Sequence, residues 1–357
     1  MRLLCAISHH GFGHLAQTAP ILHALNASHP DLEWIIWSGL ARDVLDQTLG
    51  FTFAHRHEAC DVGLLMHDAL RIDLPASRAA LAAFHQHWPQ RIAHEAHWLK
   101  QRGVTGVLSN VGYLPLAAAR AADLPGIAFC CLNWFDIARD CLGLSEALTP
   151  LLDEIAVAYR SSQAFLRLTP ALPMPWLAQC EDLPPLALLG QARREVLDRV
   201  SSPHHRRVLF GFGGVAYPAG QTPLPLPGIT WIVPDAWADP TRADLLSYAR
   251  TGLSFRDLLA SCDALVCKVG YGSFAEAAGL GLPVLYLDRP GWPETPWLTA
   301  WLHRHTRAAA LDEADLFTPR LGNILADLWQ QPPPPAADVS GAQIVAQRIL
   351  HHLHLSG

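Results

Sequence analysis

The chain has 357 residues, of which half are hydrophobic and 16% are charged, and its formal net charge is −6. This length and hydrophobic content suffice for two domains with separate cores. The acidic balance argues against a nucleic-acid partner, because nucleic-acid binding requires a basic surface.

Other features of the composition bear on the compartment and on metals. The eight cysteines show no CxxC spacing, which is typical of buried thiols in a reducing cytoplasm. The apolar run at the N-terminus is too short for a signal peptide. We also expect no transmembrane segment. The 12 tryptophans leave peripheral membrane contact open. The 19 histidines stand at no metal-ligand spacing with Cys or carboxylates, so we expect no metal ion.

The first predicted unit is a buried strand over 3–7, a glycine-rich turn and a helix over about 15–27. Gly11 and Gly13 allow the turn to fold tightly, and His14 lies where the helix begins. His14 is either a packing residue or a general base that faces a cleft. The helix dipole disfavours a positive charge at this end, so we expect it to lower the pKa of His14.

Strands and helices alternate after this unit, which predicts a doubly wound α/β domain over 1–180. The expected strands are 32–37, 51–55, 104–109 and 127–132, and the expected helices are 42–48, 76–101 and 111–121. Ligands of such sheets lie beyond the carboxyl ends of the strands. Asn110 and Asn133 each follow a strand there and are candidate acceptor contacts, although either also suits an ordinary turn.

A proline-rich stretch over 169–185 predicts the connection to a second domain, which spans 181–336. That domain begins with a strand that runs from Val208 into Gly213 and Gly214. Further on we expect a strand over 229–233 and a short helix over 254–263. A terminal helix is expected over 337–355.

The stretch from Asp263 to Leu287 predicts a βαβ unit with a strand over 264–267, a helix over 274–280 and a strand over 284–287. Gly270 and Gly272 form the turn, and Ser273 is a suitable N-cap. Glu276 follows three residues later, so the pair could be only a capping box. Lys268 favours an anion site instead: lysine occurs only at positions 100 and 268 in a chain that otherwise uses arginine.

The segment from Lys268 to Glu276 resembles the sugar-nucleotide signature of the GT-B glycosyltransferases, as found in UDP-glycosyltransferases. It is closer still to the glycosyltransferase-like N-terminal region of plant L-arabinokinases. The resemblance implies that Lys268 and Ser273 contact the donor diphosphate and that Glu276 holds the ribose hydroxyls. Glu294 and Thr295 resemble the residues that grip the donor sugar, although they stand two residues later and Thr replaces Gln.

The same resemblance extends to other residues of the second domain. It implies that the glycine turn at Gly213 and Gly214 faces the donor phosphates, together with the turn at Gly270 and Gly272. It also implies that Phe255, or its neighbour Arg256, borders the nucleobase.

The N-terminal turn from Gly11 to His14 also resembles GT-B enzymes. In UDP-glycosyltransferases the corresponding His is the catalytic base, and in a UDP-sugar hydrolase of pseudaminic acid synthesis it acts on water. The resemblance implies that His14 is catalytic and that Gly13 lies near the acceptor. The acid that orients this His in plant enzymes has no clear counterpart, and Asp136 is a candidate.

The resemblance implies two Rossmann-like doubly wound α/β domains that face each other across a cleft, with the helix of 337–357 crossing back to the first. We expect an inverting, metal-independent glycosyltransferase that acts in the cytoplasm. Its donor would be a nucleoside-diphosphate sugar, with a UDP-sugar preferred and no other cofactor. The acceptor would be a hydroxyl of a small or lipid-linked molecule. A nucleotide-sugar hydrolase and a non-catalytic sugar-nucleotide-binding module are the alternatives.

Overall fold

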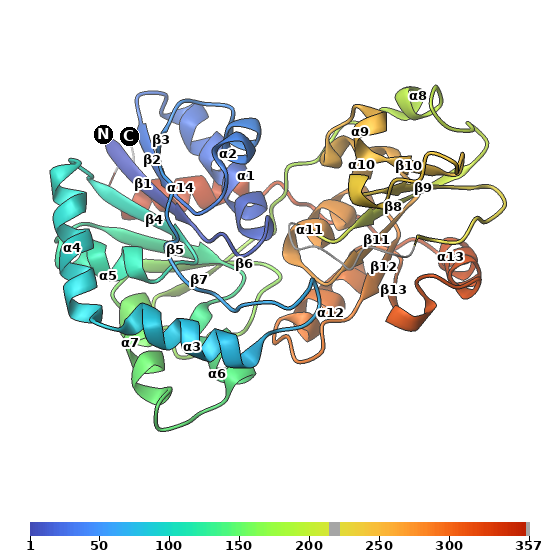
Figure 1. The fold of residues 1–357 in the computed structure, drawn as a ribbon. Helices are drawn as coiled ribbons and strands as arrows, with labels where there is room; N and C mark the ends of the chain where they lie inside the picture. The colour runs from blue at the N-terminus through green and yellow to red at the C-terminus, as the bar shows by residue number, and fades with distance from the viewer. Residues whose placement is uncertain (214–221, 355–357) are drawn as a thin grey trace.

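The computed structural model describes residues 1–213 and 222–354, which form two α/β domains side by side (Figure 1). Each domain contains one parallel sheet with helices packed around it, as the sequence predicts. Gly214, one of the predicted donor contacts, lies outside the described residues.

The first sheet has seven strands in the order β3-β2-β1-β4-β5-β6-β7, all of them parallel. Every residue of β4 and β5 is buried, because helices cover both faces of a parallel sheet. The strands are β1 (Arg2–Ile7), β2 (Glu33–Trp37), β3 (Ala54–Arg56), β4 (Gly106–Asn110), β5 (Gly126–Cys130), β6 (Ala164–Leu168) and β7 (Cys180–Leu183). The predicted connection over 169–185 therefore includes the last strand of the first sheet.

The second sheet has six parallel strands in the order β10-β9-β8-β11-β12-β13. They are β8 (Arg206–Gly211), β9 (Ile229–Val233), β10 (Leu245–Ser247), β11 (Ala264–Lys268), β12 (Val284–Leu287) and β13 (Ala308–Leu311). The central strands β8, β9 and β11 are buried over nearly their whole length.

The helices differ from the prediction by one division and at several ends. They are α1 (Gly13–Ser28), α2 (Arg42–Leu49), α3 (Leu74–His85), α4 (Trp88–Gln101), α5 (Leu114–Ala121), α6 (Trp134–Leu142), α7 (Thr149–Arg160), α8 (Arg194–Leu197), α9 (Tyr248–Thr251), α10 (Phe255–Ser261), α11 (Tyr271–Leu280), α12 (Thr295–His305), α13 (Arg320–Gln330) and α14 (Ala342–His352). The helix predicted over 76–101 is two helices, because Pro89 suits only a helix start and His87 before it is left-handed, with φ 59°. Helix α11 begins at Tyr271 and not at Phe274, α5 begins at Leu114 and not at Val111, and α14 begins at Ala342 and not at Ala337.

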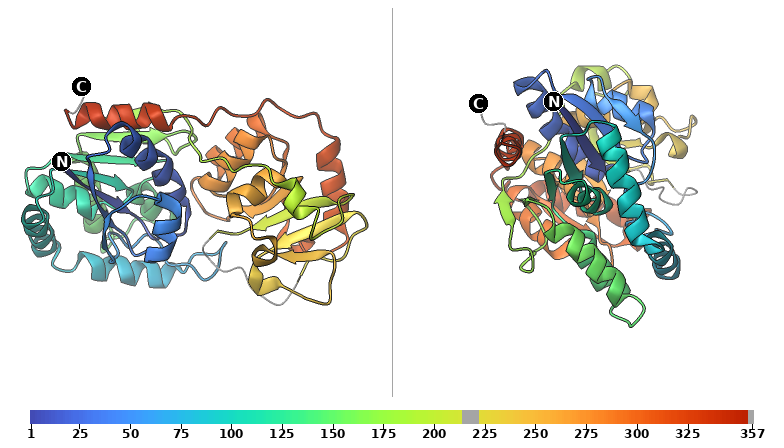
Figure 2. Two further views of the ribbon diagram at one scale, coloured as in Figure 1. Left: turned by 90° about the horizontal axis from the view of Figure 1, so that it is seen from above. Right: turned by 90° about the vertical axis from the view of Figure 1, so that its left-hand side faces the viewer.

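Helix α14 packs on α1 of the first domain although it follows the second domain in the chain (Figure 2, left). Val345 and Ile349 are fully buried on this helix. At its C-terminal end Arg348 and His352 both contact Glu181 of β7, at 2.5 and 2.7 Å. The C-terminal segment is thus part of the core of the first domain.

Ile349→Ala should lower the free energy of unfolding by about 2–4 kcal/mol, because it leaves a cavity between α14 and α1. Ile344 lies on the same helix but is 49% exposed, so Ile344→Ala should change stability by less than about 0.5 kcal/mol. Urea unfolding of both variants provides the comparison. Equal losses would show that α14 is not packed in this orientation.

Candidate active site at the domain junction

The residues singled out from the sequence gather where the strand order of each sheet reverses. In the first sheet the reversal lies between β1 and β4, and in the second between β8 and β11. His14 follows β1, and Asn110 ends β4. Gly213 follows β8, and Lys268 ends β11. Crevices at such reversals are the usual ligand sites of doubly wound sheets.

The glycine turns of the two domains lie against each other. Helices α1 and α11 are in contact, and a Cβ atom at Gly272 would lie 3.3 Å from Ala16 Cβ and 4.0 Å from Gly13 Cα. Gly272 therefore lets the start of α11 approach α1 closely. Within the second domain, Gly213 has φ +72°, and a Cβ there would lie 3.6 Å from Lys268 Cε.

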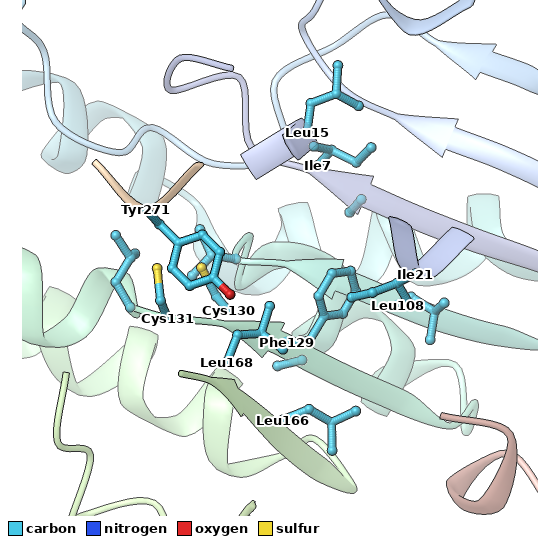
Figure 3. Packing of buried hydrophobic residues seen from close by; sticks show 14 of the residues in the cluster. Ile7, Leu15, Ile21, Leu108, Phe129, Cys130, Cys131, Leu166, Leu168 and Tyr271 are labelled. Atoms are coloured by element: carbon cyan, nitrogen blue, oxygen red, sulfur yellow. The ribbon is translucent and has the colours of Figure 1, made fainter. Parts of the chain in front are cut away.

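Tyr271, the first residue of α11, crosses into the first domain. Figure 3 shows its ring beside Cys130, Cys131 and Leu168. Its hydroxyl donates to the Thr169 carbonyl at 3.1 Å and accepts from the Leu186 N–H at 3.2 Å. A buried phenol with both hydrogen bonds satisfied fixes the two domains relative to each other.

His14 is buried, and its Nδ1 lies 2.8 Å from Asn110 Oδ1. An amide oxygen only accepts hydrogen bonds, so Nδ1 carries the proton and Nε2 keeps a free lone pair. The amide of Asn110 is held in this orientation because its Nδ2 donates to Gln17 Oε1 at 3.1 Å. The basic nitrogen of a neutral imidazole is the one without the proton, so the contact with Asn110 leaves Nε2 as the possible proton acceptor.

The acid partner suggested from the sequence is wrong. Asp136 accepts hydrogen bonds from Asn133 Nδ2 at 2.7 Å and from Trp176 Nε1 at 3.0 Å, and it does not contact His14. Asn133 is the N-cap of α6, since its Oδ1 accepts from the Asp136 N–H. Both polar atoms of the Asn133 side chain are therefore engaged, and its acceptor contact stays a prediction.

The pKa of His14 is raised, whereas the helix dipole predicted a decrease. Burial lowers it, but the Cys130 thiol, the Asp61 carboxylate and Asn110 together outweigh burial. Cys130 Sγ lies 3.8 Å from Nδ1. The pKa of Cys130 changes in the opposite direction. Burial raises it, but hydrogen bonds to Cys131 and His14 bring it down to about 6.

Asp61 was not found from the sequence. It is 1% exposed and accepts from Ser8 Oγ at 3.0 Å and from Trp134 Nε1 at 2.9 Å. The Trp134 ring lies 5.9 Å from that of His14. Asn110 and Asn133 were singled out because each comes directly after a predicted strand. Asp61 does not, so its sequence position gave no such signal.

In the second domain the capping-box interpretation fails. Gly270 is the N-cap of α11, and no side chain caps this helix. Ser273 and Glu276 therefore lie inside α11. Glu276 is buried, and burial raises its pKa to about 8. Burial, with Arg289 nearby, lowers the pKa of Lys268 to about 7.

Glu294 connects the domains. Its Oε1 accepts from the Cys131 thiol at 3.1 Å, and its Oε2 accepts from Trp292 Nε1 at 2.9 Å. Thr295 begins α12, and its buried Oγ1 has no hydrogen-bond partner. Phe255 begins α10, and its ring lies against Gly211, where a Cβ would be 2.7 Å from Phe255 Cζ.

A cavity of about 440 Å³ lies between α6 and the segment over 288–296, which comprises the loop after β12 and the start of α12. A second one, of about 270 Å³, lies between α6, Pro290 and Gly291 and the segment over 70–74. The residues that line them include Asp140, Arg289 and Trp292, but not His14, Lys268 or Glu276. Within 1–213 and 222–354, no three His, Cys, Asp or Glu side chains cluster to hold a metal ion. The described helices include none that is long and apolar enough to cross a membrane.

Asn110→Asp should raise the pKa of His14 by about one unit or more, because a carboxylate on Nδ1 stabilises the imidazolium. NMR titration of the imidazole measures this shift directly. Asn323 is exposed on α13, and Asn323→Asp should leave the His14 pKa unchanged. The same His14 pKa in all three proteins would rule out the Asn110 contact.

Glu276→Gln should make the free protein more stable than wild type at pH 8 but not at pH 5. The folded-state pKa is raised from 4.5 to about 8, so the wild-type protein loses stability as pH rises through this interval. Glutamine has no charge to bury. Denaturant unfolding at both pH values checks the difference, with Glu146→Gln at an exposed site as the control. A gap that does not depend on pH would contradict the burial of Glu276.

Comparisons with known proteins agree with this architecture. No protein family model matches the chain. The chain is 23% identical over 321 residues to an L-arabinokinase of Arabidopsis thaliana. The aligned region covers 87% of this chain and 30% of that protein. The chain thus spans less than a third of the length of this curated relative.

Solved structures match both domains together. The glycosyltransferase VinC in complex with dTDP has a TM-score of 0.57 at 15% identity and covers 99% of this chain and 95% of its own. The spinosyn forosaminyltransferase SpnP has a TM-score of 0.60 at 13% identity, with coverage of 99% and 95%. Phytolacca americana UGT2, complexed with UDP-2-fluoro-glucose and pterostilbene, has a TM-score of 0.55 at 13% identity, with coverage of 99% and 93%. The chain therefore has the two-domain fold of the GT-B glycosyltransferases.

Proposed function

We propose that the protein is an inverting glycosyltransferase that moves a sugar from a nucleoside-diphosphate sugar to a hydroxyl acceptor. The observation that carries this proposal is the meeting of both strand-order reversals at one junction, with His14 and its Asn110 partner on one side and Lys268 on the other. The GT-B fold and the structural neighbours with dTDP or a UDP-sugar support it. We further propose a cytoplasmic enzyme with a small or lipid-linked acceptor.

The donor would bind at the start of α11. The free N–H groups of a helix N-terminus and the Lys268 ammonium favour a diphosphate. The diphosphate would in turn restore the charged form of Lys268, whose pKa is about 7 in the free protein. Ser273 on the first turn would add a hydroxyl contact. Glu276, with a pKa of about 8, is mostly protonated at neutral pH and can both donate to and accept from ribose hydroxyls.

The chemistry would be a single displacement with His14 as general base. Nε2 takes the proton from the acceptor hydroxyl while its oxygen forms a bond to the anomeric carbon. The bond from that carbon to the diphosphate oxygen breaks, and the nucleoside diphosphate leaves with the electron pair. Lys268 and the α11 N-terminus stabilise this charge, so the step uses no metal ion and inverts the anomeric centre.

A second candidate is a module that binds a sugar nucleotide without catalysis. The similarity to part of an L-arabinokinase favours it, since that match covers only 30% of the relative. A nucleotide-sugar hydrolase of the same fold is a further alternative, in which water takes the place of the acceptor.

His14→Ala should lower turnover by about 10²–10⁴-fold, which is the range for one lost general base. Donor affinity, measured first by thermal shift with UDP, dTDP and their sugars, should stay unchanged. Because the His14 pKa is raised, wild-type activity should fall as pH decreases through a value above about 6.5. Product from water alone would identify a hydrolase. Nucleotide binding without turnover by either protein would support the binding module, and full turnover by His14→Ala would eliminate His14 as the base.

A further inference from the structure

Arg289 is a buried cation that forms no salt bridge with the residues that the structure describes, although Glu294 is near enough to raise its pKa. Its side chain is 6% exposed, and Nε and Nη2 are both buried without a hydrogen-bond partner within 1–213 and 222–354. These two nitrogens direct their N–H bonds from the same edge of the guanidinium, which is the edge that binds a carboxylate or phosphate through two parallel hydrogen bonds. Among the described residues Arg91 and Arg307 also have a buried nitrogen without a partner, but only Nε.

The acidic groups near Arg289 are engaged elsewhere. Both carboxylate oxygens of Glu294 accept from Cys131 and Trp292. Asp288 accepts the backbone N–H of Arg289, and Asp140 accepts from Arg139 Nε at 2.7 Å. Burial lowers the pKa of Arg289 to about 10. The Glu294 carboxylate offsets part of the cost of burying this charge, but it leaves two buried N–H donors unsatisfied, and a ligand of opposite charge would satisfy them.

The position of Arg289 places the possible ligand beside the proposed donor site. It follows β12, at the carboxyl edge of the second sheet, and its guanidinium stacks on Trp292 with Cζ 3.7 Å from the ring centroid. Together with Trp292 and Thr295 it lines the cavity of about 440 Å³. Thr295 Oγ1, which also lacks a partner, offers a hydrogen bond to a sugar hydroxyl. The proposed diphosphate contacts are on β11 and α11, and Lys268 of β11 is near enough to Arg289 for the two cations to interact.

We propose that Arg289 recognises an acidic group on the donor sugar, namely a carboxylate of the uronic-acid type. This inference rests on the proposed glycosyltransferase function and narrows its donor class. Arg289 forms two parallel hydrogen bonds with the carboxylate, and Trp292 holds the guanidinium plane. The diphosphate of the donor would be the other anion able to use the same fork, and the experiment distinguishes the two.

The test is isothermal titration of UDP, UDP-glucose and UDP-glucuronate into the wild-type protein, Arg289→Gln and Arg307→Gln. Wild type should bind UDP-glucuronate at least about 10-fold more tightly than UDP-glucose. Arg289→Gln should lose roughly 10- to 100-fold in affinity for UDP-glucuronate, the range for hydrogen bonds to a charged group, and less than about 3-fold for UDP. Arg307 lies before β13, at the opposite edge of the sheet, and its variant should bind all three as wild type does.

A second measurement covers the folding of the variant. Free Arg289→Gln should keep a cooperative thermal unfolding transition, and this would show that lost affinity does not reflect unfolding. Equal losses for UDP and UDP-glucuronate would assign Arg289 to the diphosphate and overturn the inference. Wild-type binding of UDP without preference for the acidic sugar would also overturn it, while leaving the proposed function in place. Binding of none of the three ligands, nor of dTDP, would remove the proposed function itself.

Discussion

The contact between the N-termini of α1 and α11 determines how every other part of the candidate site is arranged. The absence of a side chain at Gly272 allows the two turns to approach, and the Tyr271 phenol, bonded to Thr169 and Leu186, holds them there. Each turn belongs to a different sheet, so this one contact brings both strand-order reversals together. His14 and Lys268 thereby reach the same junction although they are far apart in the chain.

Burial displaces the titration of several groups at this junction toward their neutral forms. The pKa falls to about 7 for Lys268 and to about 10 for Arg289, and it rises to about 8 for Glu276. Each of these changes has desolvation as its largest cause, since the junction supplies few opposite charges. An anionic ligand would reverse the changes at the two cations. The buried charges therefore lower the free energy of unfolding of the ligand-free protein. Such a loss of stability is typical of binding sites.

The partner of His14 is an amide and not a carboxylate. An Asn oxygen selects the tautomer that leaves Nε2 free but adds no negative charge to stabilise the imidazolium. Cys130 and Asp61 supply that electrostatic support from other directions. The orientation of the base and its proton affinity thus depend on different residues, which single substitutions can separate.

The two doubly wound domains could be predicted from the sequence, because apolar strands and glycine turns depend on local pattern. Sequence motifs also singled out His14, Lys268, Ser273 and Glu276 as candidates, and their roles stay predictions. The sequence pattern extended one helix across Pro89 and treated Ser273 as an N-cap, since helix ends are decided by backbone geometry that a pattern leaves open. Only the tertiary structure showed the Asn110 partner, the buried Asp61, the engaged Glu294 and the unpaired Arg289. Those features depend on contacts between distant segments, where burial and the presence or absence of a partner decide what each polar group can do.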